Sequence, residues 1–197
     1  MQKIRTTLLI IALITMTGCQ QTKKEHAKHV KAWKLDKQNS TISLISTKNN
    51  KISEVFAFTQ FEGTINADGY LEISIELASL ESSIPLRNQR LQKHLFATEN
   101  FPLAEIHTQL KAEDLNTGIH SISFDVDMHG VSSILQAEFM VFDQRGTKTI
   151  TLHKPLIINA KDFGLENGIT TLKKLAKLQS IAFTVPLNII LTFEAAH

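Results

Sequence analysis

The sequence predicts an all-β fold, an up-and-down barrel of eight antiparallel strands with one or two short helices. Three observations support this prediction: apolar residues recur at every second position, turn-forming residues separate the apolar runs, and only two stretches break the two-residue period. Such alternation buries one face of a strand and leaves the other in water. A β-sandwich gives similar signals and is the alternative all-β arrangement.

The strands follow one another from the first tryptophan to the end of the chain. Alternation is clearest at 71–77, 121–128 and 181–193, where apolar residues occupy every second position. Further strands are expected near 40–47, 51–61, 103–110, 133–142 and 148–158. Asparagine- and glycine-containing turns separate them at Lys48-Asn49-Asn50, Asp68-Gly69, Asn116-Thr117-Gly118, His129-Gly130 and Arg145-Gly146.

Two stretches have a helical period instead. Residues 85–96 begin with a proline, which is favoured in a first helical turn, and place Leu91 and Leu95 on one face. Residues 169–178 combine an apolar stripe with three outward lysines. Helices of this kind are expected to cover an end of the barrel.

The N-terminal 18 residues have the features of a secretory signal peptide. Lys3 and Arg5 precede a short apolar run, and the small residues Thr17-Gly18 lie directly before Cys19. This arrangement resembles a bacterial lipoprotein lipobox, although Met16 stands where leucine is usual. The resemblance implies cleavage at residue 18 and acylation (palmitate-type) of Cys19. The alternatives are an ordinary signal peptide followed by a free thiol, or an uncleaved membrane helix, for which the apolar run is far below the ~20 residues required.

Residues 19–32 are predicted to be a polar tether, because they contain too little apolar surface to fold. Residues 33–197 then form one barrel domain. By resemblance to enterobacterial sorting rules, Gln20 directly after the cysteine favours the outer membrane, facing the periplasm. Loss of residues 1–18 removes two of the 21 basic side chains and leaves 19 against 19 acidic ones. Such a balance argues against nucleic-acid binding, which requires a basic face.

Several short motifs, taken in order, resemble the YceI-like family of bacterial lipid-binding proteins. The likeness covers roughly 33–194. Its motifs are Trp33-Lys34-Leu35-Asp36 with Asn39-Ser40, Phe61-Glu62-Gly63-Thr64-Ile65, Arg87-Asn88-Gln89-Arg90-Leu91 with Leu95-Phe96 and Phe101-Pro102, Met128-His129-Gly130-Val131, and Lys161-Asp162-Phe163-Gly164-Leu165. One departure is that His94 lies four positions after Arg90, where the family's common form has a histidine three positions after the arginine.

The resemblance implies a lipocalin-like barrel whose apolar tunnel holds a polyisoprenoid, such as a quinone tail or a prenyl phosphate, with no catalysis. The protein would then be a membrane-anchored carrier or store of an amphiphilic isoprenoid. The alternative is a barrel filled by its own side chains, since the chain has 11 phenylalanines. Such a barrel would be a structural or assembly lipoprotein that binds a protein partner. The sequence leaves the oligomeric state open, a dimer included.

Candidate ligand-binding residues fall into two groups. Arg87, Asn88 and Arg90 are placed where a polar head could be bound at the tunnel mouth, because the planar arginine fork suits phosphate or carbonyl oxygens. A solvated helix face is the alternative. Four phenylalanines are candidates either for the cavity lining or for plain core: Phe56, Phe58, Phe96 and Phe101. Phe56 and Phe58 share a strand face opposite to Val55 and Ala57, and the sequence does not decide which face is inside.

Catalysis and metal binding are not expected. The sequence has no nucleophile-elbow, phosphate-loop or zinc-protease motif. Asp125 and Asp127 continue a polar strand face, so a solvated pair is preferred to an acid–base pair. The histidines are scattered, and His26 and His29 lie in the polar tether. No cofactor is predicted beyond a bound isoprenoid lipid.

Overall fold

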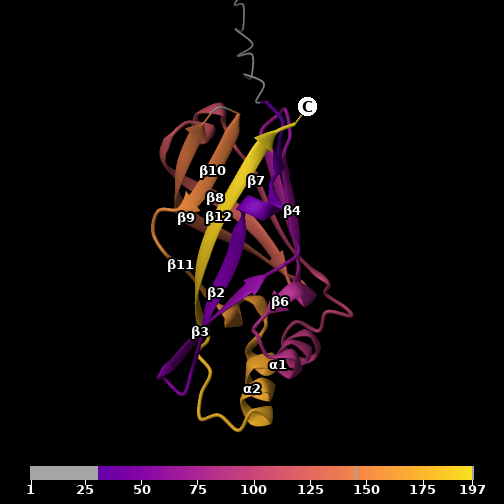
Figure 1. Cartoon of the computed structure of the whole chain (residues 1–197). Coiled ribbons are helices and arrows are strands. Elements are labelled where there is room, and N and C mark those ends of the chain that lie inside the picture. Colours follow the sequence, from indigo (N-terminus) through magenta and orange to yellow (C-terminus); the bar gives the residue numbers. More distant parts are fainter. Residues whose placement is uncertain (1–30, 145, 197) are drawn as a thin grey trace, which may run out of the picture.

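The structure, a computed structural model, describes residues 31–144 and 146–196. These residues form a closed antiparallel β-barrel with two short α-helices at one end (Figure 1). The predicted all-β barrel of eight strands is therefore confirmed. The predicted signal peptide, Cys19 and the tether up to residue 30 lie outside the described residues.

The barrel is built from strand segments that pair only with antiparallel neighbours. The segments are β1 (Trp33–Leu35), β2 (Thr41–Lys48), β3 (Ile52–Phe58), β4 (Phe61–Ile65), β5 (Tyr70–Glu76), β6 (Leu80–Glu81), β7 (Leu103–Gln109), β8 (Gly118–Met128), β9 (Val131–Gln144), β10 (Thr147–Leu152), β11 (Leu156–Asn159) and β12 (Thr184–Ala195).

Short interruptions divide four of the eight barrel strands into pairs of segments. β1 and β2 both pair with β12, and the turn η1 (Lys37–Asn39) separates them. Three more barrel strands consist of two consecutive segments: β3 with β4, β5 with β6, and β10 with β11. The barrel closes where β12 pairs with β10 on one side and with β1 and β2 on the other. Each barrel strand thus neighbours the strand that precedes it in sequence.

Both predicted helical stretches are present. Residues 85–96 form α1 (Pro85–Arg90), continued by the π-helical turn η3 (Leu91–Phe96), with Pro85 in the first turn. The second helix, α2 (Glu166–Leu175), begins three residues earlier than predicted and ends before residue 178. It stops there because Lys177 has a left-handed backbone with φ of 53°, which does not continue a right-handed helix.

A packed core closes the barrel at the end opposite the helices. Ile65, Val141 and Phe193 are fully buried in the barrel. Lys148 is also buried: its Nζ lies 4.8 Å from the centroid of the Trp33 ring and donates to the carbonyl oxygen of Leu115 at 2.8 Å. The same ammonium pairs with Asp143 at 2.7 Å. A lysine is tolerated here because hydrogen bonds and a carboxylate compensate its charge.

The domain contains its own core and all the strand pairings that close the barrel. These pairings lie between Trp33 and Ala195. Within the part of the chain that the structure describes, no helix is both long enough and apolar enough to cross a membrane.

Candidate ligand-binding cavity

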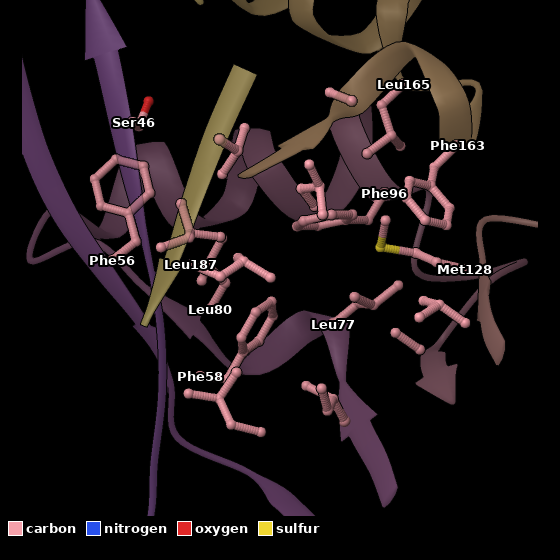
Figure 2. Close-up of a pocket in the computed structure, with 18 of the residues that line it drawn as sticks. Ser46, Phe56, Phe58, Leu77, Leu80, Phe96, Met128, Phe163, Leu165 and Leu187 are labelled. Carbon is pink, nitrogen blue, oxygen red and sulfur yellow. The ribbon is translucent and has the colours of Figure 1, made fainter. Parts of the chain in front are cut away.

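The barrel is hollow. A cavity of about 500 Å³ runs between the sheet and the two helices and is lined almost entirely by aliphatic and aromatic side chains. Figure 2 shows labelled members of this lining, among them Phe56, Leu77, Met128 and Phe163, surrounding one space. The volume falls in the range of small-molecule sites. The alternative function, a structural or assembly lipoprotein, assumed a barrel filled by its own side chains. This cavity does not match that assumption.

The phenylalanines of β3 point into the cavity. Leu44 on β2 pairs with Phe56, and Ile42 pairs with Phe58, and all four side chains line the cavity. Val55 lies on the opposite face and is 68% exposed. The face of β3 that carries Phe56 and Phe58 therefore points inward, together with Ile42 and Leu44 of β2. The alternation of the sequence alone did not determine this. Phe96 on η3 also lines the cavity and is buried.

The helices cover one end of the cavity and fit closely together. Ile169 and Leu172 on α2 and Leu91 and Leu95 on η3 contribute apolar side chains to the lining. Gly168 makes this packing possible, because a Cβ atom there would lie only 2.5 Å from the carbonyl oxygen of His94. A side chain at this position would push α2 away from η3.

The β2–β3 hairpin forms another edge of the same end. Its tip, Asn49 and Asn50, has positive φ values of 53° at both residues, which suits asparagine in a tight hairpin turn. The Asn49 side-chain oxygen accepts from the backbone N–H of Gln179 at 2.8 Å, and the backbone N–H of Asn49 donates to the carbonyl of Ser180 at 2.9 Å. These bonds fix the hairpin to the loop after α2.

The cavity opens to the surface at the end where the helices lie, and we call this opening the mouth. Ile84 and Leu86 belong to the cavity lining and are nevertheless 47% and 55% exposed, so the cavity reaches the surface beside α1. Polar lining residues also gather here: Ser46, Lys48, Glu54, Arg87 and Arg90. The cavity is thus polar at one end and apolar along the rest of its length, except for Thr108, whose hydroxyl donates to the Ser123 carbonyl at 2.8 Å.

Arg87 is held at the mouth by a dense set of contacts. Its guanidinium donates to Glu54 Oε2 at 2.9 Å, to Ser82 Oγ at 2.8 Å and to the Ser82 carbonyl at 2.5 Å, and it lies 4.6 Å from the Phe56 ring centroid. Lys48 Nζ lies 2.6 Å from the same Glu54 oxygen. The hydrogen bond from Lys48, supported by Arg87, holds the pKa of Glu54 below its ordinary value.

Arg90 has no such partner. The residue is half-buried in the mouth, and its guanidinium forms no hydrogen bond or ion pair with any residue that the structure describes. Its five donors are therefore available to an incoming group. Both arginines predicted to bind a polar head line the cavity, but only the side chain of Arg90 is free of hydrogen bonds and ion pairs with the described residues.

Two predicted site residues lie outside the cavity lining. Asn88 accepts from the Ser82 N–H at 3.0 Å and donates to Glu81 Oε2 at 2.9 Å, so it fixes the turn that leads into α1. Phe101 packs instead on the β8–β9 turn, with its ring centroid 4.6 Å from that of His129. The prediction that Phe101 lines the cavity does not match its position, because the loop after η3 folds back over Gly130.

The sequence reasoning missed three polar residues of the mouth, Ser46, Lys48 and Glu54. A signal for them exists in the alternation. Ser46 and Lys48 follow Leu44 at steps of two, and Glu54 precedes Phe56 by two, so all three share the inward face. Once the inner face is known, polar residues at the hairpin end of that face mark the mouth.

The described residues offer no metal site of three or more histidine, cysteine or acidic side chains. His107 and Asp127 come within 3.9 Å of each other on neighbouring strands, but as an isolated pair.

Comparisons with known proteins agree with this architecture. A polyisoprenoid binding domain from Saccharophagus degradans, implicated in plant cell wall breakdown, is 29% identical, with a TM-score of 0.81, and the match covers 85% of this chain and all of that one. Burkholderia cenocepacia BcnA is 17% identical, with a TM-score of 0.65 over 80% and 98% of the two chains. The YCEI protein of Campylobacter jejuni is 14% identical, with a TM-score of 0.55 over 72% and 85%. No curated protein matches the sequence.

The fold and the cavity define a hollow antiparallel β-barrel of the lipocalin-like type, an architecture of binding proteins. Residues 33–193 match the YceI-like domain, and the chain belongs to the YceI-like family. The family membership predicted from the ordered motifs is confirmed.

Proposed function

We propose that this protein binds an amphiphilic isoprenoid, with the tail in the barrel cavity and the head at the mouth. The observation that carries the proposal is a cavity that is apolar along its length and polar at one open end. Three basic side chains and one acidic one line that end, so a phosphate or a quinone carbonyl would find donors there. The description of the Saccharophagus degradans domain as polyisoprenoid binding supports the same reading.

The cavity also limits the length of the tail that it encloses. A volume of about 500 Å³ lies in the range of small-molecule sites and accommodates several five-carbon units of a prenyl tail. Each buried methylene contributes about 0.8 kcal/mol to binding. A tail of this length therefore supplies most of the affinity, and a longer one has to leave the mouth.

We further propose that acylation of Cys19 holds the protein on the outer membrane, on the periplasmic side, where it acts as a carrier or store. Two or more acyl chains give stable anchoring, and the domain would then remain near membrane-dissolved isoprenoids. Intact-mass measurement of the protein from bacterial membranes is expected to show a mature N-terminus at Cys19 carrying acyl mass. A soluble, unmodified product cleaved elsewhere would refute the anchor without touching the ligand proposal.

The ligand proposal is tested by native mass spectrometry of residues 20–197 purified from bacteria. We expect a one-to-one adduct that solvent extraction identifies as an isoprenoid. Farnesyl and geranylgeranyl phosphates and the matching prenyl quinones are then added to delipidated protein, and the preferred head is read from competition between them. A bare mass that no prenyl compound changes would refute the proposal.

A further inference from the structure

The mouth is bordered by exposed apolar side chains, which we call the rim: Ile52, Ile84, Leu86 and Leu175. They come from the β2–β3 hairpin, from the start of α1 and from the end of α2, and their exposed fractions are 48%, 47%, 55% and 42%. Figure 1 places these three segments at the same end of the molecule. Large apolar side chains gathered at one opening indicate an interaction surface.

The same three segments carry a strong excess of positive charge. Residues 48–54, 84–96 and 166–182, all of them described, contain eight basic and two acidic side chains, whereas the other described residues contain seven basic and sixteen acidic ones. Both acids are already ion-paired, Glu54 with Lys48 and Arg87, and Glu166 with Lys161. Six cations on these segments form no ion pair with any described residue: Lys51, Arg90, Lys93, Lys173, Lys174 and Lys177.

We propose that the rim and these six cations form a docking surface for an anionic phospholipid bilayer. Apolar side chains enter the boundary between headgroups and acyl chains, and basic ones meet the phosphates, as in interfacial membrane-binding surfaces. A second copy of this chain fits less well, since a two-fold interface would place the same positive excess against itself. Docked in this way, the cavity opens directly into the bilayer, and an apolar ligand enters without crossing water.

The test measures partitioning of residues 31–197 onto lipid vesicles by flotation. This segment contains the buried core and every strand pairing that closes the barrel, and it lacks both Cys19 and the polar residues that follow it, so only the barrel is assayed; its melting transition is measured first. Vesicles of phosphatidylglycerol with phosphatidylethanolamine are compared with pure phosphatidylcholine. None contains an isoprenoid, so the result does not depend on what the cavity holds. We expect partitioning onto the anionic vesicles alone, weakening as salt is added.

Variants with matched controls locate the surface. Leu86→Ser in the rim is expected to lower the partition coefficient about tenfold. The double variant Lys173→Gln with Lys174→Gln is expected to lower it about fivefold for each charge removed. The controls carry the same changes elsewhere: Ile134→Ser, 74% exposed on β9, and Lys34→Gln on β1. Both controls should bind as the parent does, and all variants should keep its melting temperature, because the altered side chains do not belong to the buried core.

Three results would overturn the proposal. The first is absence of binding to anionic vesicles by the folded protein. The second is an equal loss in Ile134→Ser or Lys34→Gln, which would mean non-specific adsorption. The third is a concentration-dependent dimer that Leu86→Ser abolishes, which would show that a second copy covers the rim.

Discussion

Replacing Ser46 by phenylalanine is expected to weaken binding of a prenyl tail about a thousandfold while leaving the barrel folded. Ser46 points from β2 into the cavity, beside Phe56 (Figure 2). The new ring adds about five non-hydrogen atoms, or about 150 Å³ of the approximately 500 Å³ available, at about 30 Å³ each. A tail that filled the space loses about five methylene-sized groups, worth about 4 kcal/mol at about 0.8 kcal/mol each. At about 1.4 kcal/mol per tenfold, this is a thousandfold in Kd.

Equilibrium dialysis of labelled geranylgeranyl phosphate against delipidated protein measures the change. Ser123→Phe is the matched control, since Ser123 is exposed on the outer face of β8 and should leave the affinity unchanged. The reasoning is refuted if Ser46→Phe, with an unaltered melting temperature, binds as tightly as the parent. It is refuted equally if Ser123→Phe loses as much affinity, because the effect would then not come from the cavity.

Three further predictions concern the mouth. Arg90→Gln should lower affinity for a prenyl phosphate about tenfold to a hundredfold with unchanged stability, whereas Arg87→Gln should cost about 1–3 kcal/mol of stability in urea unfolding because it removes the donors to Glu54 and to the hydroxyl and carbonyl of the buried Ser82; the opposite assignment of the two effects would contradict the head-group role. The pKa of Glu54 is lowered in the folded state, so the stability that its charge contributes is complete above the ordinary pKa of 4.5 and is lost as pH falls through the lower pKa of the folded state. The free energies of unfolding of Glu54→Gln and the parent should therefore differ at neutral pH and converge in acid. A difference that persists in acid would count against this. Gly168→Ala should lower the melting temperature and increase hydrogen exchange in α2, because the added methyl group meets backbone of η3; an unchanged Tm would show that the two helices can separate freely.

Much of the fold could be predicted because the barrel follows local rules. Alternation fixed the eight strands, and Asn49 and Asn50 identified the β2–β3 turn. The interruptions within strands were less visible, since the sequence gives only weak signals for turns such as η1. Helix α2 was placed three residues late because its first turn, Glu166 to Gly168, carries no apolar residue.

The site was harder to predict because its residues are brought together by long-range pairing. Arg87 was predicted from its motif, but its hydrogen bond to Glu54 joins residues that are 33 positions apart in the sequence. Lys148 is buried against Trp33 because β10 and β1 both pair with the end of β12, an arrangement that no local pattern in the sequence indicates. Phe101 was misplaced for the same reason, since its partner His129 belongs to a distant turn.

The described chain begins at the closed end of the barrel, where Trp33 pairs with Ala195, and the mouth lies at the other end (Figure 1). The 12 residues of β12 span about 40 Å at roughly 3.3 Å per residue. The stretch from Cys19 to Trp33 reaches about 50 Å at most, at roughly 3.5 Å per residue. If Cys19 is the anchor, an upright barrel turns its opening away from its own membrane and toward whatever faces it. Because that reach exceeds the length of the barrel, a fully extended stretch would also let the barrel turn over, so its extension would decide whether cargo is exchanged only with the opposite bilayer or with its own membrane as well.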